Sequence, residues 1–291
     1  MKSAKSKPEQ LNCGGKCLDL SMPSIMGVLN ITPDSFSDGG QFFSGHTVDQ
    51  DKVLSAVETM IAEGADIIDL GGESTRPGAE TVSVQQELDR VIPLLEILSA
   101  NHDSIYSVDT STPEVMREAA NAGAHIINDV RALQRQGALQ VVADIGLPVC
   151  LMHMQNQPQT MQQNPQYQDV LSEVLEFLDQ RKQQALSAGI QEDQILLDPG
   201  FGFGKNLQHN LALFAGLEQL AATNHPIVVG LSRKSMIGQL IDANVNDRVI
   251  GSVTMATLAA QKIHRAGGAS ILRVHDVKQT KQAIDIWQAV G

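Results

Sequence analysis

Short apolar runs alternate with longer stretches of helical periodicity along most of the chain, and each run ends at a polar residue. We predict strands at residues 24–30, 66–70, 105–109, 125–129, 148–153, 195–198, 227–232 and 270–276. Between them the spacing predicts helices such as those at residues 47–63, 82–99, 113–122, 166–188, 207–222 and 248–265. Strands that are apolar on both faces and joined by helices are typical of a parallel sheet. Eight such units predict an α/β protein with a (β/α)8 TIM-barrel fold.

Punctuating residues support these boundaries and the domain organisation. Thr112 followed by Pro113 predicts a helix start, and glycines stand where four helices should end: Gly64, Gly123, Gly189 and Gly267. No Pro-rich or Ser-rich linker divides the chain. We therefore expect a disordered tail at residues 1–9 and one domain over residues 10–291, with a short N-terminal hairpin at residues 10–20 closing the barrel floor.

A doubly wound open sheet is the alternative fold. Its first βα turn would carry a G-x-G-x-x-G sequence, which this chain lacks there. Gly200, Gly202 and Gly204 form a G-x-G-x-G run after the sixth predicted strand, and we interpret it as a flexible loop over the barrel mouth.

Composition and charge limit the classes of partner. Hydrophobic residues make up 42% and charged residues 19% of the chain, which is ordinary for a globular protein. The formal net charge of −12 and the pI near 5.0 argue against a general nucleic-acid or anionic-membrane surface, so any phosphate site must be local. The three cysteines are expected to be thiols. Because no apolar signal region or long apolar run occurs, we expect a cytoplasmic protein.

Polar residues end the predicted strands, where a (β/α)8 barrel carries its active site. In chain order they are Asn30, Asp69, Asp109, Asn128, His153, Asp198, Ser232 with Lys234, and Arg273 with His275. Each one alone could cap a helix or settle a turn. Their occurrence at every end favours a shared site. We set His153 aside as a packing residue because methionines flank it.

One part of this set suits a flat heterocycle. Asp109, Asn128, Asp198 and Lys234 combine carboxylates, an amide and a cation. A carboxylate accepts two hydrogen bonds in one plane, so it can fix a ring with an amidine-like edge.

A second part indicates an anion such as phosphate. Arg76, Arg273 and His275 supply the donors, and Asn30 offers an oxygen ligand for a hard divalent cation. Arg273 and His275 should share a face because side chains alternate along a strand. The alternative is a rim ion pair for Arg273 and an ordinary buried histidine for His275.

Two long loops, at residues 30–40 and 71–78, follow the first two predicted strands and combine Pro, Gly and hydroxyl residues. Long loops in compact domains are usually functional or disordered, and these two lie at the expected catalytic face. We expect them to close over the site.

Eight segments of the chain resemble those of the dihydropteroate synthase family. They are MGVLNITPDSFSDGG at 26–40, GADIIDLGGESTRPGA at 64–79, SVDTSTPEV at 107–115, IINDVRAL at 126–133, CLMHMQ at 150–155, LLDPGFGFGK at 196–205, GLSRKSMIG at 230–238 and RVHDV at 273–277. The segments occur in chain order from about residue 24 to the end. Two small departures are Asn156, where the family often has Gly, and Thr112, where Lys is usual.

The resemblance implies a transferase of folate biosynthesis, which condenses 6-hydroxymethyl-7,8-dihydropterin diphosphate with 4-aminobenzoate to 7,8-dihydropteroate and pyrophosphate. By motif, the pterin is expected to contact Asp109, Asn128, Met152, Asp198 and Lys234. The diphosphate is expected at Asn30, Arg76, Arg273 and His275, with Asn30 as the Mg²⁺ ligand. The 4-aminobenzoate pocket is expected at Phe36, Thr75, Pro77, Phe203 and Ser232. The catalytic residues of this set are expected to be Asn30, Lys234, Arg273 and His275.

The resemblance also implies a mechanism and partners. Mg²⁺ and the cationic residues would neutralise the departing diphosphate, and the aminobenzoate nitrogen would attack without a nucleophilic side chain. Aminobenzoate would bind after the diphosphate, once the two loops have closed. Sulfonamides would inhibit as aminobenzoate mimics, and the protein would be a homodimer through helices of its C-terminal half.

Two other functions compete with this one. A pterin-binding methyltransferase that serves a corrinoid would share the Asp and Asn set but would not need Arg273, His275 or the GESTRPG loop. A paralogue that binds pterin without turnover would have lost residues such as Asn30 or Lys234, and none is lost.

Overall fold

A closed barrel of parallel strands is the centre of the computed structural model, which describes residues 9–32, 42–44, 47–74, 82–158 and 160–290. Eight strands follow one another around the barrel in chain order. They are β3 (Ser24–Asn30), β6 (Ile67–Gly71), β7 (Ile105–Asp109), β8 (Ile126–Asp129), β9 (Val149–Met152), β10 (Ile195–Asp198), β11 (Ile227–Val229) and β12 (Ser270–Val274). The predicted fold is confirmed, and the open sheet is excluded because β12 pairs with β3.

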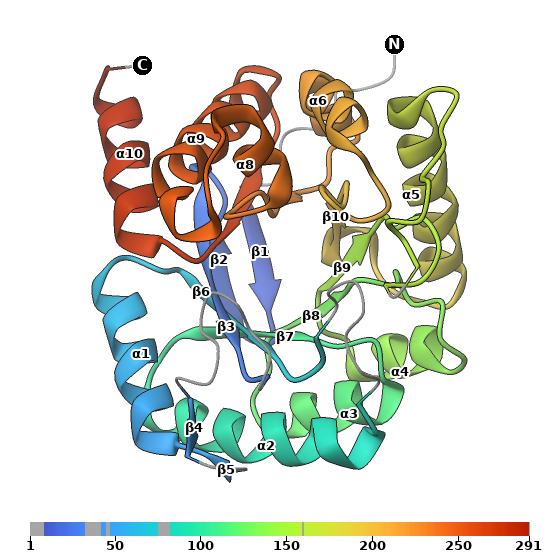
Figure 1. Cartoon of the computed structure of the whole chain (residues 1–291). Coiled ribbons are helices and arrows are strands. Elements are labelled where there is room, and N and C mark those ends of the chain that lie inside the picture. The colour runs from blue at the N-terminus through green and yellow to red at the C-terminus, as the bar shows by residue number, and fades with distance from the viewer. Residues whose placement is uncertain (1–8, 33–41, 45–46, 75–81, 159, 291) are drawn as a thin grey trace.

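Helices form an outer ring around the barrel (Figure 1). They are α1 (Gln50–Ala62), α2 (Val84–Asn101), α3 (Pro113–Asn121), α4 (Ala138–Ile145), α5 (Val170–Ser187), α6 (Leu207–Ala215), α7 (Leu217–Ala221), α8 (Ser235–Ile241), α9 (Val249–Arg265) and α10 (Val277–Val290). None of the helices in the described residues is long and apolar enough to cross a membrane.

The two faces of each barrel strand pack differently because side chains alternate along a strand. Outward-facing residues of the strands join the helices in two large apolar clusters, which include Ile127, Leu197 and Leu272 in one and Leu29 and Leu70 in the other. Inward-facing residues near the strand starts form a third, smaller cluster. The barrel interior is therefore filled at its amino end and carries polar residues only toward its carboxyl end.

The predicted N-terminal hairpin closes the amino end of the barrel. Strands β1 (Gln10–Cys13) and β2 (Lys16–Asp19) pair antiparallel around Gly14 and Gly15, both with positive φ. Their buried side chains pack with one inward-facing residue from each barrel strand: Leu11, Cys13 and Leu18 meet Met26, Ile67, Ile105, Ile126, Cys150, Leu196, Val228 and Ile271. Figure 1 shows the hairpin lying across the centre of the ring. A second small hairpin, β4 (Phe43–Ser44) and β5 (Thr47–Val48), precedes α1.

Helix ends follow the predicted punctuation. Pro113 begins α3, and the glycines predicted to end helices, Gly64, Gly123, Gly189 and Gly267, all have positive φ. Several predicted elements differ in extent from the observed ones. The helix expected at 47–63 begins at Gln50, since residues 47–48 form β5, the helix expected at 166–188 begins at Val170, and the strand expected at 270–276 ends at Val274. Two other elements differ more. The helix expected at 207–222 is two helices that meet at Gly216, where a Cβ would lie 2.3 Å from Leu171 of α5. The strand expected at 227–232 ends at Val229.

The tail predicted at residues 1–9 falls almost wholly outside the described residues. The carbonyl of Glu9 accepts a hydrogen bond from the backbone N–H of Leu20 at 2.8 Å. The disorder of the tail and the single domain over residues 10–291 stay predictions.

Candidate active site

Three predicted site residues lie in a row at the carboxyl end of the barrel. In the strand register, Asn30 of β3 is opposite Gly71 of β6, Gly71 is opposite Asp109 of β7, and Asp109 is opposite Asn128 of β8. A Cβ on Gly71 would lie 3.5 Å from Asn30 Oδ1 and 3.7 Å from Asp109 Cβ. The glycine therefore leaves an open position between the amide of Asn30 and the carboxylate of Asp109.

Arg273 of β12 lies among these residues and not apart from them. Its Nε donates to Asp69 Oδ2 at 2.7 Å, and its Nη2 donates to Asp109 Oδ2 at 2.9 Å. The sequence assigned Arg273 to an anion site and Asp109 to a heterocycle site. The ion pair brings together residues that we predicted for different ligands, so one guanidinium lies within reach of both predicted sites.

Asp198 and Lys234 both contact the loop that follows β10. Asp198 Oδ1 accepts a hydrogen bond from the backbone N–H of Gly200 at 2.6 Å. Lys234 Nζ donates to the carbonyl of Phe201 and lies 4.7 Å from the centroid of the Phe203 ring. Because β11 ends early, Lys234 is the residue before the first turn of α8 and not a strand residue. The ammonium thus joins the Gly200–Gly204 loop to the start of α8.

Ser232 and His275 form a second contact at the mouth. Ser232 Oγ lies 3.0 Å from His275 Nδ1 and 3.2 Å from the backbone nitrogen of His275. The family resemblance implies that Ser232 contacts aminobenzoate and that His275 contacts the diphosphate. Their contact brings those two expected subsites to one place. Met152 lies at the end of β9, buried, with its Cγ 3.4 Å from where a Cβ on Gly200 would be.

Burial shifts the pKa values of the charged groups at the site. It raises the pKa of Asp109 to about 8, against the opposing attraction of Arg273, with repulsion from Asp69 adding to it. Burial also raises the pKa of Asp198, against the attraction of Lys234. It lowers the pKa of Lys234 to about 8, against the attraction of Asp198. Groups with pKa values displaced toward neutrality are typical of functional sites.

Lys205 was missed by the sequence reasoning. Its buried Nζ contacts three acceptors: the carbonyls of Gly200 and Phe203 at 2.9 and 3.0 Å, and His153 Nδ1 at 2.8 Å. An ammonium has three N–H donors, so this environment satisfies all of them. The lysine ties together the two ends of the loop that carries Phe203. His153, which we set aside as a packing residue, packs edge-on against Phe177 with ring centroids 4.9 Å apart, and it is also a polar partner of Lys205.

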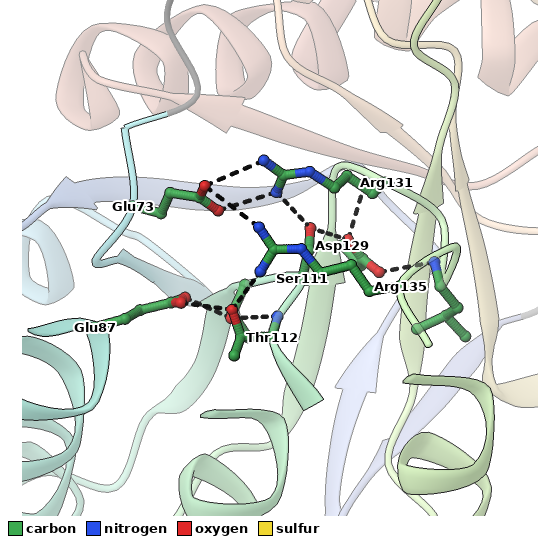
Figure 2. Close-up of polar contacts among 9 residues, drawn as sticks. Glu73, Glu87, Ser111, Thr112, Asp129, Arg131 and Arg135 are labelled. Carbon is green, nitrogen blue, oxygen red and sulfur yellow. Dashed lines mark hydrogen bonds and ion pairs between the residues drawn. The ribbon is translucent and has the colours of Figure 1, made fainter. Parts of the chain in front are cut away.

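A buried polar network beside the mouth was also missed (Figure 2). Arg131 donates to both carboxylate oxygens of Glu73, at 2.9 and 3.1 Å, and Arg135 Nη2 lies 3.6 Å from the same carboxylate. Arg135 also donates to the Thr112 hydroxyl, which donates in turn to Glu87 at 2.7 Å. Glu73 follows β6 and Arg131 follows β8, so the network ties two loops of the mouth together. Glu73 and Arg131 both lie inside segments that resemble the dihydropteroate synthase family, and this was the only sequence feature that pointed to them.

Four predicted site residues lie outside the described residues: Phe36, Thr75, Arg76 and Pro77. The other predicted site residues all lie at the carboxyl end of the barrel. They are Asn30, Asp109, Asn128, Met152, Asp198, Phe203, Ser232, Lys234, Arg273 and His275. This arrangement can hold a planar ligand with several N–H groups against carboxylates and an amide, beside cations that suit a phosphate.

Comparison with known proteins agrees with this chemistry. Residues 26–275 match the model of the family described as pterin binding enzyme. That range contains every predicted site residue and all of the barrel strands except the first two residues of β3. The fold and the site therefore define a pterin-binding enzyme.

Similar proteins narrow the class. The chain is 53% identical over 282 residues to the dihydropteroate synthase of Haemophilus influenzae, covering 97% of this chain and 99% of that one. A solved structure of Yersinia pestis dihydropteroate synthase with a sulfonamide drug is 50% identical with a TM-score of 0.91, covering 97% and 98% of the two chains. Another, from Xanthomonas albilineans with 7,8-dihydropteroate, is 45% identical with a TM-score of 0.84 over the same shares. The chain belongs to the dihydropteroate synthase family, the transferases that condense 6-hydroxymethyl-7,8-dihydropterin diphosphate with 4-aminobenzoate.

Proposed function

We propose that this chain makes 7,8-dihydropteroate with the residues of its barrel mouth, and that Asp109, Asn128, Asp198 and Lys234 orient the pterin while Met152 packs on its ring. The observation that carries this proposal is the row of carboxylate and amide groups at one end of the barrel. Gly71 lies in this row and, having no side chain, leaves space between Asn30 and Asp109. Pterin N–H groups need acceptors in one plane, and buried carboxylates are strong acceptors.

Loss of diphosphate is assisted by the basic residues of the mouth. The C–O bond to the pterin methylene breaks, its electron pair leaves with the diphosphate, and the electron-rich pterin spreads the positive charge left on carbon. Arg273, His275 and Arg76 hold the growing negative charge, since fixed donors stabilise charge that develops in the transition state. The nitrogen of 4-aminobenzoate then attacks the methylene carbon and loses a proton.

Mg²⁺ fits this site as a partner of the substrate. In the parts of the chain that the structure describes, no group of three or more His, Cys, Asp or Glu residues could hold a metal ion. Magnesium commonly takes few protein ligands and several phosphate and water oxygens, so Asn30 Oδ1 with the diphosphate is a suitable donor set. When bound, Mg²⁺ supplies further positive charge to the leaving group.

The 4-aminobenzoate lies at the outer part of the mouth. We assign it to Phe203 and Ser232, together with Phe36, Thr75 and Pro77. Phe203 presents a ring beside the Lys234 ammonium, and Ser232 is already in contact with His275. Sulfonamides share the aniline and acidic groups of aminobenzoate, so we expect them to compete for this position.

Pyrophosphate release from the dihydropterin diphosphate tests the proposed function. Purified protein is assayed with and without 4-aminobenzoate, and with Mg²⁺ present or chelated. We expect release that depends on both, with 7,8-dihydropteroate as the product. Tight pterin binding without product would contradict the proposal and favour a binding paralogue.

The pH dependence of the reaction follows from two of the displaced pKa values. Lys234 must be an ammonium, and its pKa is lowered to about 8, so kcat/KM should fall as the pH rises through about 8. Asp109 must be a carboxylate, and burial raises its pKa, so the acidic limb should lie above the usual carboxyl range. The measurement is kcat/KM for the dihydropterin diphosphate between about pH 5 and pH 10. In Lys234→Arg the alkaline limb should move upward, and an unmoved limb would exclude Lys234 as its source.

We also propose that the chain is a homodimer through its C-terminal helices. Helix α9 packs against α8 and α10, and apolar side chains are exposed on all three, including Ile250 at 81% and Ile286 at 66%. We propose that these side chains form one apolar patch, and a large contiguous patch of this kind is unusual on a monomer. We expect Ile250→Glu to give a monomer by light scattering, whereas Val84→Glu, an exposed apolar residue on α2, should stay dimeric. A wild-type monomer would contradict the proposal.

A cytoplasmic location is the last element of the proposal. Cys13, Cys17 and Cys150 are all free thiols, which suits a reducing compartment.

A further inference from the structure

Asp69 is a charged residue of the barrel that no subsite described above uses. It lies in β6, two residues before Gly71, and its register partners are Val28 of β3 and Ser107 of β7. It is fully buried, with 0% of its surface exposed. Since Gly71 is opposite Asp109, Asp69 lies one tier beneath the row of site residues. A carboxylate at that depth acts on a ligand only through its neighbours.

Its contacts reach both halves of the site. Asp69 Oδ2 accepts hydrogen bonds from Arg273 Nε at 2.7 Å and from Asn128 Nδ2 at 3.3 Å. A carboxylate can only accept hydrogen bonds, so the Asn128 amide must point its nitrogen toward Asp69. The amide oxygen of Asn128 then points away from Asp69. Anchoring the guanidinium at Nε leaves its outer nitrogens for Asp109 and the mouth.

In the part of the chain that the structure describes, the other carboxylate oxygen of Asp69 has no hydrogen-bond partner in this layer of the barrel interior. Asp69 Oδ1 and Ser107 Oγ are both buried without a hydrogen-bond partner among the described residues. A buried carboxylate with an unsatisfied oxygen costs free energy, because that oxygen has lost its hydration without gaining a partner. Such a cost is often retained where a charge holds functional groups in place.

We infer that Asp69 is a positioning residue of this enzyme, which sets the orientation of Arg273 and Asn128 and so acts on diphosphate and pterin recognition together. The inference rests on the proposed function for the assignment of those two ligand groups. It adds a second tier to the site, in which one carboxylate couples the cation of the diphosphate subsite to the amide of the pterin subsite.

Asp69→Asn tests the inference, with Ser107→Ala as the matched control. The control removes the hydroxyl of the register neighbour, which is equally buried and forms no side-chain hydrogen bond among the described residues. We expect Asp69→Asn to lower kcat/KM for the dihydropterin diphosphate by about 10- to 100-fold, with KM for 4-aminobenzoate within about twofold of wild type. It should also weaken binding of pyrophosphate alone, measured by calorimetry. Ser107→Ala should match wild type in all of these, and equal behaviour of the two variants overturns the inference.

A double variant separates positioning from a merely structural role. If Asp69 acts largely through Arg273, adding Asp69→Asn to Arg273→Met should change the pyrophosphate dissociation constant by less than about threefold. An additional change of tenfold or more overturns the inference. This comparison also serves if Asp69→Asn alone does not fold, because the double variant removes both members of the ion pair. Absence of dihydropteroate with wild type would instead refute the proposed function and leave the pyrophosphate comparison valid.

Discussion

Asp198→Asn is expected to lower kcat/KM for the dihydropterin diphosphate by about 10²- to 10⁴-fold. The substitution keeps the size of the side chain but removes the charge and replaces one oxygen acceptor with an N–H donor, which weakens both hydrogen bonds that we propose from the pterin. Hydrogen bonds to a charged group contribute about 1.5–3 kcal/mol each, and two of them account for a loss of this size. Asp198 Oδ1 also accepts from Gly200 N–H at 2.6 Å, so the amide oxygen can keep the loop in place. Steady-state kinetics at saturating 4-aminobenzoate measure the effect.

Asp129→Asn is the matched control for this prediction. Asp129 is an equally buried carboxylate at the end of β8, but it accepts from Ser111 Oγ and from the backbone N–H groups of Arg131 and Leu133 at 2.8 and 2.7 Å. Those contacts are structural, so we expect a lower melting temperature with kcat/KM within about tenfold of wild type. If the two variants lost activity equally, Asp198 would have no special part in binding the pterin.

Much of the fold follows from the hydrophobic pattern because each barrel strand is apolar on both faces. Three predicted strands, at 24–30, 105–109 and 195–198, have the observed bounds. The strand at 227–232 was overextended because Leu231 continues the apolar run and is buried, although the strand itself ends at Val229. Helices α4, α8 and α10 were not among those predicted, and α4 and α8 are short. Periodicity over so few residues is a weak signal.

The polar residues at the strand ends predicted where the site lies, but they did not predict which of its side chains contact one another. This pattern placed Asp109, Asn128 and Asp198 at the mouth, because the carboxyl ends of parallel strands meet at one end of a barrel. It could not show that Arg273 pairs with Asp69 and Asp109, which are 204 and 164 residues away in the chain. Lys205 escaped because it follows a strand by seven residues and reaches the site through its long side chain. Contacts of this kind depend on the closed barrel and have no local pattern.

The loop after β10 shows how the backbone supports the chemistry. It gives Asp198 a hydrogen-bond donor at Gly200, presents the Phe201 carbonyl to Lys234, and is closed by Lys205. Its glycines Gly200, Gly202 and Gly204 all have positive φ, so the G-x-G-x-G run is a structural requirement. From the sequence alone, we interpret this glycine run only as a flexible loop. Its hydrogen bonds instead make it a fixed wall between the pterin and aminobenzoate positions that we propose.

Gly200→Ala is therefore expected to have the largest effect on stability. Gly200 has φ +68°, and a Cβ there would lie 1.8 Å from the carbonyl oxygen of His153, which is a backbone atom and cannot rotate away. Relief requires the end of β9 or the loop itself to shift, at a cost of about 4 kcal/mol or more in the free energy of unfolding. Urea unfolding gives this quantity directly. Any shift of the loop also moves the acceptor for Lys234, so kcat should fall at temperatures where the variant is still folded.

Gly189→Ala separates the cost of the backbone conformation from that of the clash. Gly189 has φ +101°, and a Cβ there would have nothing within 4 Å, so only the left-handed conformation is penalised, by about 1–2 kcal/mol. The difference between the two variants measures what the close approach of Gly200 to His153 contributes. Equal unfolding free energies with full activity in Gly200→Ala would mean that the loop is pliable. In that case the hydrogen bonds of Lys205 and Asp198 would adjust to a shifted loop backbone and would not determine its position.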